Sequence, residues 1–362
     1  MAIDFTPERW ASVKETYSRW WAGGLNRPVV ELVLNGRDPG RPQPKAPVLT
    51  QATCADFSIP AADLIDRLDY ELSKKVYLGD SFPMVNMDSF GPGVVAAFLG
   101  AQIDSSTGAV WFHPPSDISI EDLHFSYDPG NIWLRRIKEI CAAAMDRWQG
   151  QVLVGMTDLG GTLDILSSFR PSEKLPMDLI DSPEEVKRLV GEIHELWHRF
   201  RAEIDDVLQP VNPGYTSWCQ IYSDKPFYIC QSDFSFMISA DMFREFVRDE
   251  LDACTRRLPR SFYHCDGAGQ LPHLDMLLAM DHLDGVQWEP GEGALGFEHW
   301  IDVYKKIFSA GKKTQLHKTN SEVVLKVLRE AGHGGGVHCR LLGGDVADER
   351  AFRKDLSKLA EY

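Results

Sequence analysis

The chain has 362 residues, of which 44% are hydrophobic and 25% charged, proportions typical of a globular protein that can bury a large core. Its 53 Asp and Glu residues outnumber its 38 Lys and Arg residues, so the formal net charge is −15. This acidic balance, without any basic run, disfavours nucleic-acid binding and attraction to anionic membranes, and it favours a small-molecule substrate or a protein partner.

Cysteine usage and the length of the apolar runs favour a cytoplasmic protein. The seven cysteines are odd in number, widely spaced and without a CxxC motif, which predicts free thiols in a reducing compartment. No apolar run approaches the ~18 residues that a membrane span needs, and no secretory hydrophobic segment opens the sequence.

The predicted elements begin with a helix over residues 7–22 and continue as short strands that alternate with amphipathic helices. Strands are expected over residues 29–34, 84–87, 152–156, 217–222, 228–231, 261–264, 285–288, 313–316 and 336–339. Helices are expected to open at Pro183, after Ser239, and after Asn320 or Ser321. From about residue 150 this alternation is the pattern of a parallel sheet.

Four tryptophans, Trp10, Trp20, Trp21 and Trp133, leave two interpretations open. They can pack in the core, which is the commoner use of tryptophan, or they can mark an exposed surface of a homodimer.

Polar side chains follow most of the expected strands. In a barrel of parallel strands, the loops that follow the strands build the active site, so these side chains are expected to meet there. The set comprises Asp88, Asp158, Tyr222, Asp224, Asp233, His264, Cys265, Asp266, Glu289, His317 and Cys339. Asp158 and Asp224 are equally consistent with helix caps, but the set as a whole favours a functional site.

The segment Tyr263-His264-Cys265-Asp266-Gly267 is the best candidate for a metal centre. Zinc binds imidazole, thiolate and carboxylate, and a catalytic zinc has three protein ligands. Residues 264 and 266 of a strand project to one side, so His264 and Asp266 can share an ion with Cys339 as the third ligand. If the strand ends at His264, Cys265 can replace Asp266. The alternative is a His–Asp pair that contacts substrate without a metal.

Further residues are expected to bind substrate. His273 lies at the start of a predicted helix, where free backbone N–H groups hold anionic groups, although a surface or capping role is as consistent. Asp158, Tyr222, Trp288 and His317 are expected to line the pocket.

Several motifs together resemble the uroporphyrinogen decarboxylase superfamily. They are Gly91-Pro92-Gly93 with Leu99-Gly100, Asp158-Leu159-Gly160-Gly161, the segment 175–186, the Asp233 segment that leads to Ser239, and His264-Cys265-Asp266-Gly267. The resemblance implies one α/β domain over residues 1–362: a (β/α)8 TIM barrel with a helical extension at residues 1–26 and the active site at the carboxyl ends of the strands.

That superfamily contains decarboxylases and zinc-dependent methyltransferases that work with corrinoid proteins. The true decarboxylases carry an arginine-rich N-terminal stretch, and residues 27–32 here lack one. The methyltransferases hold zinc with His-x-Cys on one strand and a Cys on a later strand. His264 matches the first position and Cys339 the last, but Asp266 stands at the middle position with Cys265 beside it. An Asp ligand makes a harder Lewis acid, which suits an oxygen substituent better than a thiol.

The first hypothesis is therefore a zinc-assisted methyltransferase or demethylase that acts on a small methylated molecule. Asp88, Asp233 or Glu289 would move protons, and a partner protein would supply the corrinoid.

Two other hypotheses stay open. One is a metal-free lyase that acts on a carboxylated small molecule. In it, Asp88 or Asp233 stabilises a protonated intermediate while His264 and Tyr222 orient the substrate. The other is a barrel that binds a ligand without catalysis.

Overall fold

The computed structural model describes residues 3–332 and 334–362. Met1 and Ala2, with which the predicted N-terminal extension and domain begin, and His333 within the predicted domain lie outside the described residues. The strands are β1 Val29–Leu34, β2 Val76–Gly79, β3 Met84–Asn86, β4 Gln102–Asp104, β5 Trp111–His113, β6 Leu153–Gly155, β7 Phe227–Gln231, β8 Arg260–Asp266, β9 Gly285–Glu289, β10 Lys313–Thr319 and β11 Val337–Leu341. The α-helices are α1 Pro7–Trp21, α2 Ala61–Ser73, α3 Val95–Phe98, α4 Ile132–Trp148, α5 Thr162–Phe169, α6 Lys174–Asp181, α7 Pro183–Leu208, α8 Ala240–Phe243, α9 Asp249–Arg256, α10 Leu274–Leu278, α11 Ile301–Ser309, α12 Ser321–Ala331 and α13 Glu349–Ala360.

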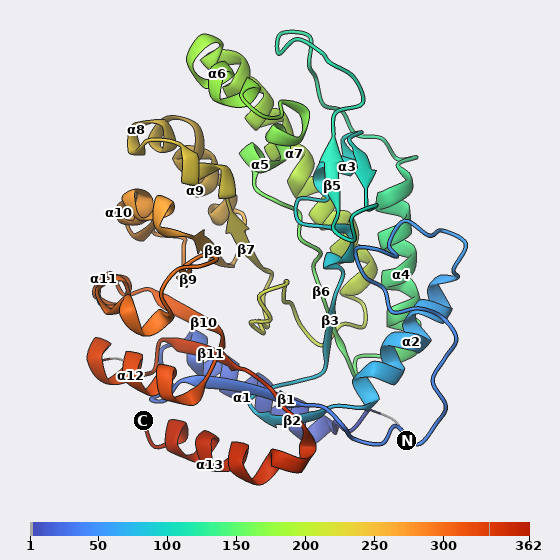
Figure 1. Ribbon diagram of the computed structural model, residues 1–362, viewed down its shortest axis with the longest axis vertical. Coiled ribbons are helices and arrows are strands. Elements are labelled where there is room, and N and C mark those ends of the chain that lie inside the picture. The colour runs from blue at the N-terminus through green and yellow to red at the C-terminus, as the bar shows by residue number, and fades with distance from the viewer. Residues whose placement is uncertain (1–2, 333) are drawn as a thin grey trace.

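The main sheet has seven strands in the order β2-β1-β11-β10-β9-β8-β7. Adjacent strands of this sheet are parallel, except that β2 is antiparallel to β1. Strands β3 and β6 form a separate parallel pair, and β4 with β5 forms an antiparallel pair. Figure 1 shows α8 to α12 outside the curved row of strands from β7 to β11, with β3 and β6 across the molecule beside α4 and α7. The fold is thus mixed α/β and barrel-like.

The complete eight-stranded ladder predicted from the resemblance is not formed. Within residues 3–332 and 334–362, no ladder joins β6 to β7 or β2 to β3. The expected strand at residues 217–222 is instead a loop, in which Gln220 has a positive φ of 64°. A single backbone hydrogen bond of 2.9 Å, from Met156 N–H to Thr216 O, links the end of β6 to this loop. The loop therefore occupies the gap that another ladder would close.

The N-terminal helix α1 contributes to the core. Trp10, Trp20 and Trp21 are buried, and the indole N–H of Trp21 donates to Tyr222 O at 2.8 Å. Trp133 is half-buried against the ring of Phe57. Trp10, Trp20 and Trp21 therefore belong to the core, as the first interpretation expected, whereas Trp133 is partly exposed.

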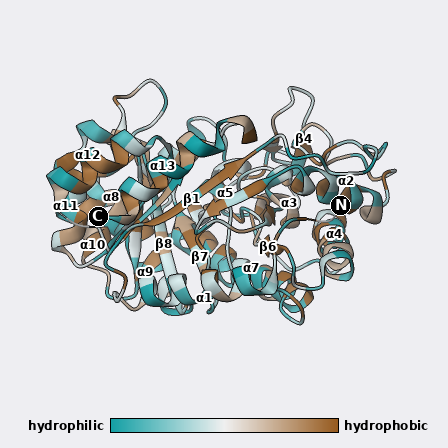
Figure 2. Cartoon of the chain, turned by 90° about the horizontal axis from the view of Figure 1, so that it is seen from below, coloured by the Kyte–Doolittle hydropathy of each residue, from teal (hydrophilic) through white to brown (hydrophobic). Residues whose placement is uncertain are grey.

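The helices owe their positions to their two-sided composition. Helix α12 buries Val324, Val327 and Leu328 against the sheet while Glu322 and Lys326 face water, and the Asn320 side chain caps it by accepting from Val323 N–H. Figure 2 shows this mixture of hydrophilic and hydrophobic surface on the outer helices, with a hydrophobic β1 in the interior. Among the described residues, no helix combines the length and apolar composition that crossing a membrane requires.

The loop after β6 packs against the end of β7, a contact that we call the seam, and it depends on the close approach of Gly161 to the backbone of Gln231. A methyl group at this position would lie 2.1 Å from Gln231 O, so Gly161→Ala is expected to destabilise the protein by about 2–3 kcal/mol through overpacking. The measurement is the denaturant concentration at the midpoint of unfolding. Gly191→Ala is the matched control, because the space beside Gly191 in α7 is open, and about 1 kcal/mol of stabilisation is expected there. Equal stability of the two variants would contradict this account of the seam.

Candidate active site

The carboxyl ends of β8, β9 and β10 surround one cavity of about 490 Å3. Its lining comprises His264, Asp266, Glu289, Pro290, Gly291, Glu292, Ala294, Leu295, Gly296, Phe297, His317 and Lys318. His264, Asp266, Glu289 and His317 were all predicted at this end of the sheet, and the structure brings them together.

Three of the polar side chains form a candidate metal centre. One potential ligand atom from each of Asp233, His264 and Asp266 lies within 4.8 Å of the other two. Nε2 of His264 is 3.9 Å from Oδ2 of Asp266, and both residues project from β8 toward the cavity. Two carboxylates and an imidazole suit zinc as three protein ligands with one open position. Asp233, predicted to move protons, is therefore placed as a possible third ligand.

The two cysteines expected as metal ligands lie elsewhere. Cys265 and Cys339 are both fully buried, and each follows an inward-facing histidine by one position on its strand. The thiol of Cys339 donates to Val29 O at 3.4 Å. Burial raises the pKa of Cys265 to about 12 and also raises the pKa of Cys339. Cys265 and Cys339 lie outside the group formed by Asp233, His264 and Asp266, so their role as metal ligands stays a prediction.

Four carboxyl groups that do not line the cavity interact with one another through their charges. Burial, followed by neighbouring charge, raises the pKa of Asp158 and of Asp164 to about 7. Burial also raises the pKa of Asp233 to about 7, although water reaches its side chain, and the charges of Asp158 and Asp266 add to the shift. The pKa of Asp88 is raised by burial and by Asp158, and its Oδ1 is buried without a hydrogen bond. Groups of this kind exchange protons near neutral pH.

Asp158 and Asp164 also hold the loops of the site in place. Oδ1 of Asp158 accepts from the backbone N–H groups of Gly160 at 3.0 Å and Gly93 at 3.4 Å, which joins two of the glycine-containing motifs. Asp164 accepts from the N–H groups of Asp233 at 3.0 Å and Phe234 at 2.7 Å. Asp164 therefore fixes the backbone that presents the Asp233 carboxylate.

Glu289 and His317 line the cavity beside the candidate metal ligands, and Glu289 is the register partner of Asp266 on the neighbouring strand. Burial and the charge of Asp266 raise the pKa of Glu289 to about 8, so this carboxyl is mostly protonated at neutral pH. His317 lies with Nδ1 3.7 Å from Oε1 of Glu289 and with Nε2 3.0 Å from a guanidinium nitrogen of Arg340. Burial and then Arg340 lower the pKa of His317 to about 3, which keeps the imidazole neutral.

Lys318 lines the cavity and has a strained backbone conformation. It has a positive φ of 51°, and the register between β10 and β11 shifts between Leu316 and Thr319. Such a bulge re-aims a side chain, and strain of this kind is often retained at functional sites. Lys318 thus places a cation among the acidic groups.

Three predicted substrate-binding residues belong to the core instead. The hydroxyl of Tyr222 donates to Pro213 O at 3.1 Å, and its ring packs on Tyr17. His273 is fully buried, stacks on Phe243 at 4.3 Å and donates from Nε2 to Ser235 O.

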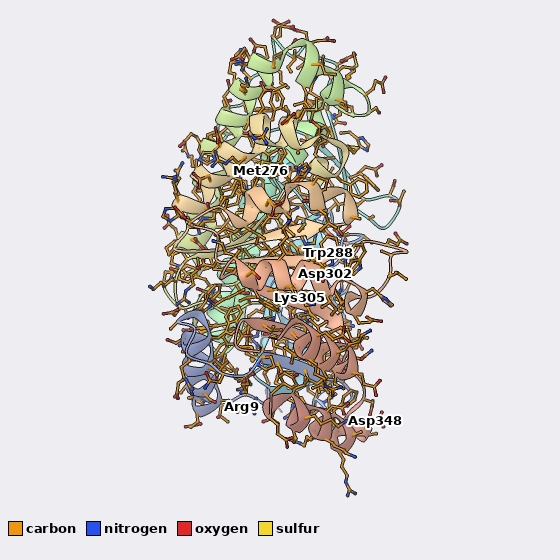
Figure 3. The ribbon with its side chains drawn as sticks, turned by 90° about the vertical axis from the view of Figure 1, so that its left-hand side faces the viewer. Arg9, Met276, Trp288, Asp302, Lys305 and Asp348 are labelled. Atoms are coloured by element: carbon orange, nitrogen blue, oxygen red, sulfur yellow. The ribbon has the colours of Figure 1, made fainter. Side chains whose placement is uncertain are left out.

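Trp288 is also fully buried and meets Trp300 edge to face at 5.1 Å. In the view of Figure 3 the β9 residue Trp288 projects close to Asp302 of α11, and Trp288 is not among the residues that line the cavity. Asp224 pairs with Arg260 near the opposite ends of the strands.

Residues that the sequence analysis missed complete the site. The ring of Trp218 meets His264 edge to face at 4.9 Å, and Gln287 contacts Nδ1 of His264. Gln287 and Gln315 are fully buried in the middle of β9 and β10. A polar side chain buried in a strand needs a hydrogen-bond partner, so these two glutamines in the sequence were the signal for a buried polar network beside His264.

Comparisons with known proteins address the fold. No protein-family model and no curated protein sequence matches the chain. The chain shares its fold with a methyltransferase. That solved structure, from Methanosarcina mazei, matches over 96% of this chain and 98% of its own, with a TM-score of 0.55 and 13% sequence identity. At this identity the likeness establishes the fold alone. A second structure, macrophomate synthase, has 13% identity over 65% of this chain and 73% of its own, and its TM-score of 0.24 carries no argument.

Proposed function

We propose that the protein is a metal-assisted methyltransferase or demethylase that acts on a small molecule whose methyl group is bonded to oxygen. The observation that carries the proposal is the donor set of Asp233, His264 and Asp266 at the carboxyl ends of the strands. A set of two carboxylates and one imidazole favours a harder ion than a thiolate-rich set does, and such an ion favours an oxygen substituent. The fold shared with a methyltransferase supports the reaction class.

The chain's own residues have distinct roles in this proposal. Asp233, His264 and Asp266 would hold zinc, which when bound would supply Lewis-acid chemistry at the methyl-bearing oxygen. Glu289, protonated up to about pH 8, supplies a proton to the leaving oxygen. The methyl carbon–oxygen bond breaks, the carbon bonds to the acceptor, and the oxygen keeps the electron pair and takes the proton. Lys318, which also lines the cavity, binds an anionic group of the substrate.

The acceptor in this proposal is a corrinoid carried by a partner protein. Apolar side chains around the mouth support docking of such a partner: Phe236, Met237 and Leu295 are 55%, 66% and 63% exposed. Phe236 and Met237 follow Asp233 in the same short helix, residues Asp233–Met237, and Leu295 lines the cavity.

The test is methyl transfer from a small donor to free cob(I)alamin in the presence of zinc-loaded protein, followed by the absorbance of methylcobalamin. A panel of small methyl ethers, methylamines and methyl thioethers serves as donors, with His264→Ala as the control. The expected result is transfer from a methyl ether by the wild type and none by the variant. Release of CO2 from a carboxylated substrate by zinc-free protein, without methyl transfer, would instead establish the lyase.

A further inference from the structure

A row of buried polar side chains crosses the sheet from His264. The strand register pairs His264 with Gln287, Gln287 with Gln315, and Gln315 with His338. The hydrogen-bonded atoms are 2.5 Å apart between His264 and Gln287, 2.6 Å between the two glutamines, and 3.0 Å between Gln315 and His338. Both glutamines and His338 are fully buried, so their partners come from within the protein.

The backbone carbonyl of Cys219 sets the direction of this row. A carbonyl only accepts, so the atom of Gln315 that lies 2.7 Å from Cys219 O is the amide nitrogen. The amide oxygen of Gln315 consequently faces Gln287 and accepts from its Nε2. The oxygen of Gln287 is then the atom that faces His264, and Nδ1 of His264 has to carry the proton that it donates.

The far end of the row agrees with this direction. Because Gln315 donates to Nδ1 of His338, the proton of His338 lies on Nε2, which donates to the hydroxyl oxygen of Tyr17 at 3.0 Å. Tyr17 in turn donates to Oε1 of Glu31 at 2.5 Å, and Oε2 of Glu31 is 3.4 Å from a nitrogen of Arg340. Reversing the row would place two acceptors together at the Cys219 carbonyl. A buried polar network in which every member is satisfied holds its members rigidly.

We propose that Gln287 and Gln315 are positioning residues that hold His264 as the Nδ1–H tautomer. Nε2 is then unprotonated and keeps its lone pair toward Asp266, whose Oδ2 is 3.9 Å away. Partners that fix the tautomer of a metal-binding histidine change metal affinity by about 10–100-fold. The consequence for an ion rests on the proposed function, whereas the tautomer itself does not.

The experiment reads the tautomer directly in zinc-free protein by long-range 1H–15N correlation of 15N-labelled histidine, with the His264 signals identified by their loss in His264→Ala. The wild type is expected to show a single Nδ1–H tautomer. Gln287→Leu is expected to give a mixture of tautomers, and Gln315→Leu is expected to do the same because it frees the Gln287 amide to rotate. Zinc affinity should fall about 10–100-fold in both.

Gln270→Leu is the matched control, because Gln270 is also fully buried but accepts from Tyr263 outside the row. It is expected to keep the single tautomer even if it lowers stability. If Gln287→Leu does not fold, Gln315→Leu decides. A wild type with Nε2–H or mixed tautomers, or a single Nδ1–H tautomer retained in the folded variants, would overturn the inference. A wild type that binds no zinc yet shows the single Nδ1–H tautomer would overturn the proposed function and leave this inference standing.

Discussion

Asp233→Asn is expected to lower kcat/KM for methyl transfer by roughly 10³-fold and to weaken zinc binding. Lewis-acid assistance contributes several kcal/mol, and each 1.36 kcal/mol is tenfold in rate. Asp233 is solvent-exposed, and the backbone N–H that it donates to Asp164 is unchanged in the variant, so the fold should be retained. Zinc affinity is measured by competition with a chromophoric chelator, and kcat/KM with the methyl ether found in the donor panel.

The control for Asp233→Asn is Asp241→Asn, which removes an exposed carboxylate of α8 outside the cavity. It is expected to leave both measurements unchanged. The pairing of the two measurements also separates two roles for Asp233. Lost activity with wild-type zinc affinity would remove Asp233 from the ligand set and return it to the proton-transfer role that the sequence suggested.

Glu289→Gln is expected to stabilise the zinc-free protein at pH 8 and above but not at pH 4. Burial and Asp266 raise the pKa of Glu289 to about 8 in the folded state, above the ordinary value near 4.5. The folded state therefore binds this proton more tightly than the unfolded state, and the stability of the wild type falls as pH rises from about 4.5 to 8. Glutamine does not ionise, so the variant lacks this loss, which is on the order of a few kcal/mol.

The measurement for Glu289→Gln is the free energy of unfolding by urea from pH 4 to pH 9, with a chelator present. The difference between variant and wild type should grow across the window from about 4.5 to 8 and level off above it. A difference in unfolding free energy that stays constant over the whole range would mean that the pKa of Glu289 is not shifted in the folded state.

The sequence predicted the parallel half of the fold well because buried strands and two-sided helices leave clear patterns. The strand at residues 29–34 coincides with β1, and the helix expected from residue 7 coincides with α1 within one residue. The loop at residues 217–222 was taken for a strand because its apolar composition is that of a buried strand, and only tertiary contacts such as the bond from Gln315 to Cys219 O determine its path.

Within the site, alternation along β8 correctly placed His264 and Asp266 together. The same alternation gives His338 and Cys339 opposite directions on β11, and the thiol of Cys339 lies against Val29 O. Asp233 lies in the segment after β7 rather than on β8. Its approach to His264 therefore depends on the pairing of β7 with β8 and on the hydrogen bond from its backbone N–H to Asp164. Such a distance between residues far apart in sequence has no signature in local periodicity.

The proposed function depends on a metal ion held by Asp233, His264 and Asp266. Metal binding is tested most directly by the metal content of wild type, His264→Ala and Cys339→Ala, all purified without chelators. About one zinc per chain is expected in the wild type and in Cys339→Ala, and none in His264→Ala. A wild type without metal, or loss of the ion in Cys339→Ala, would contradict it.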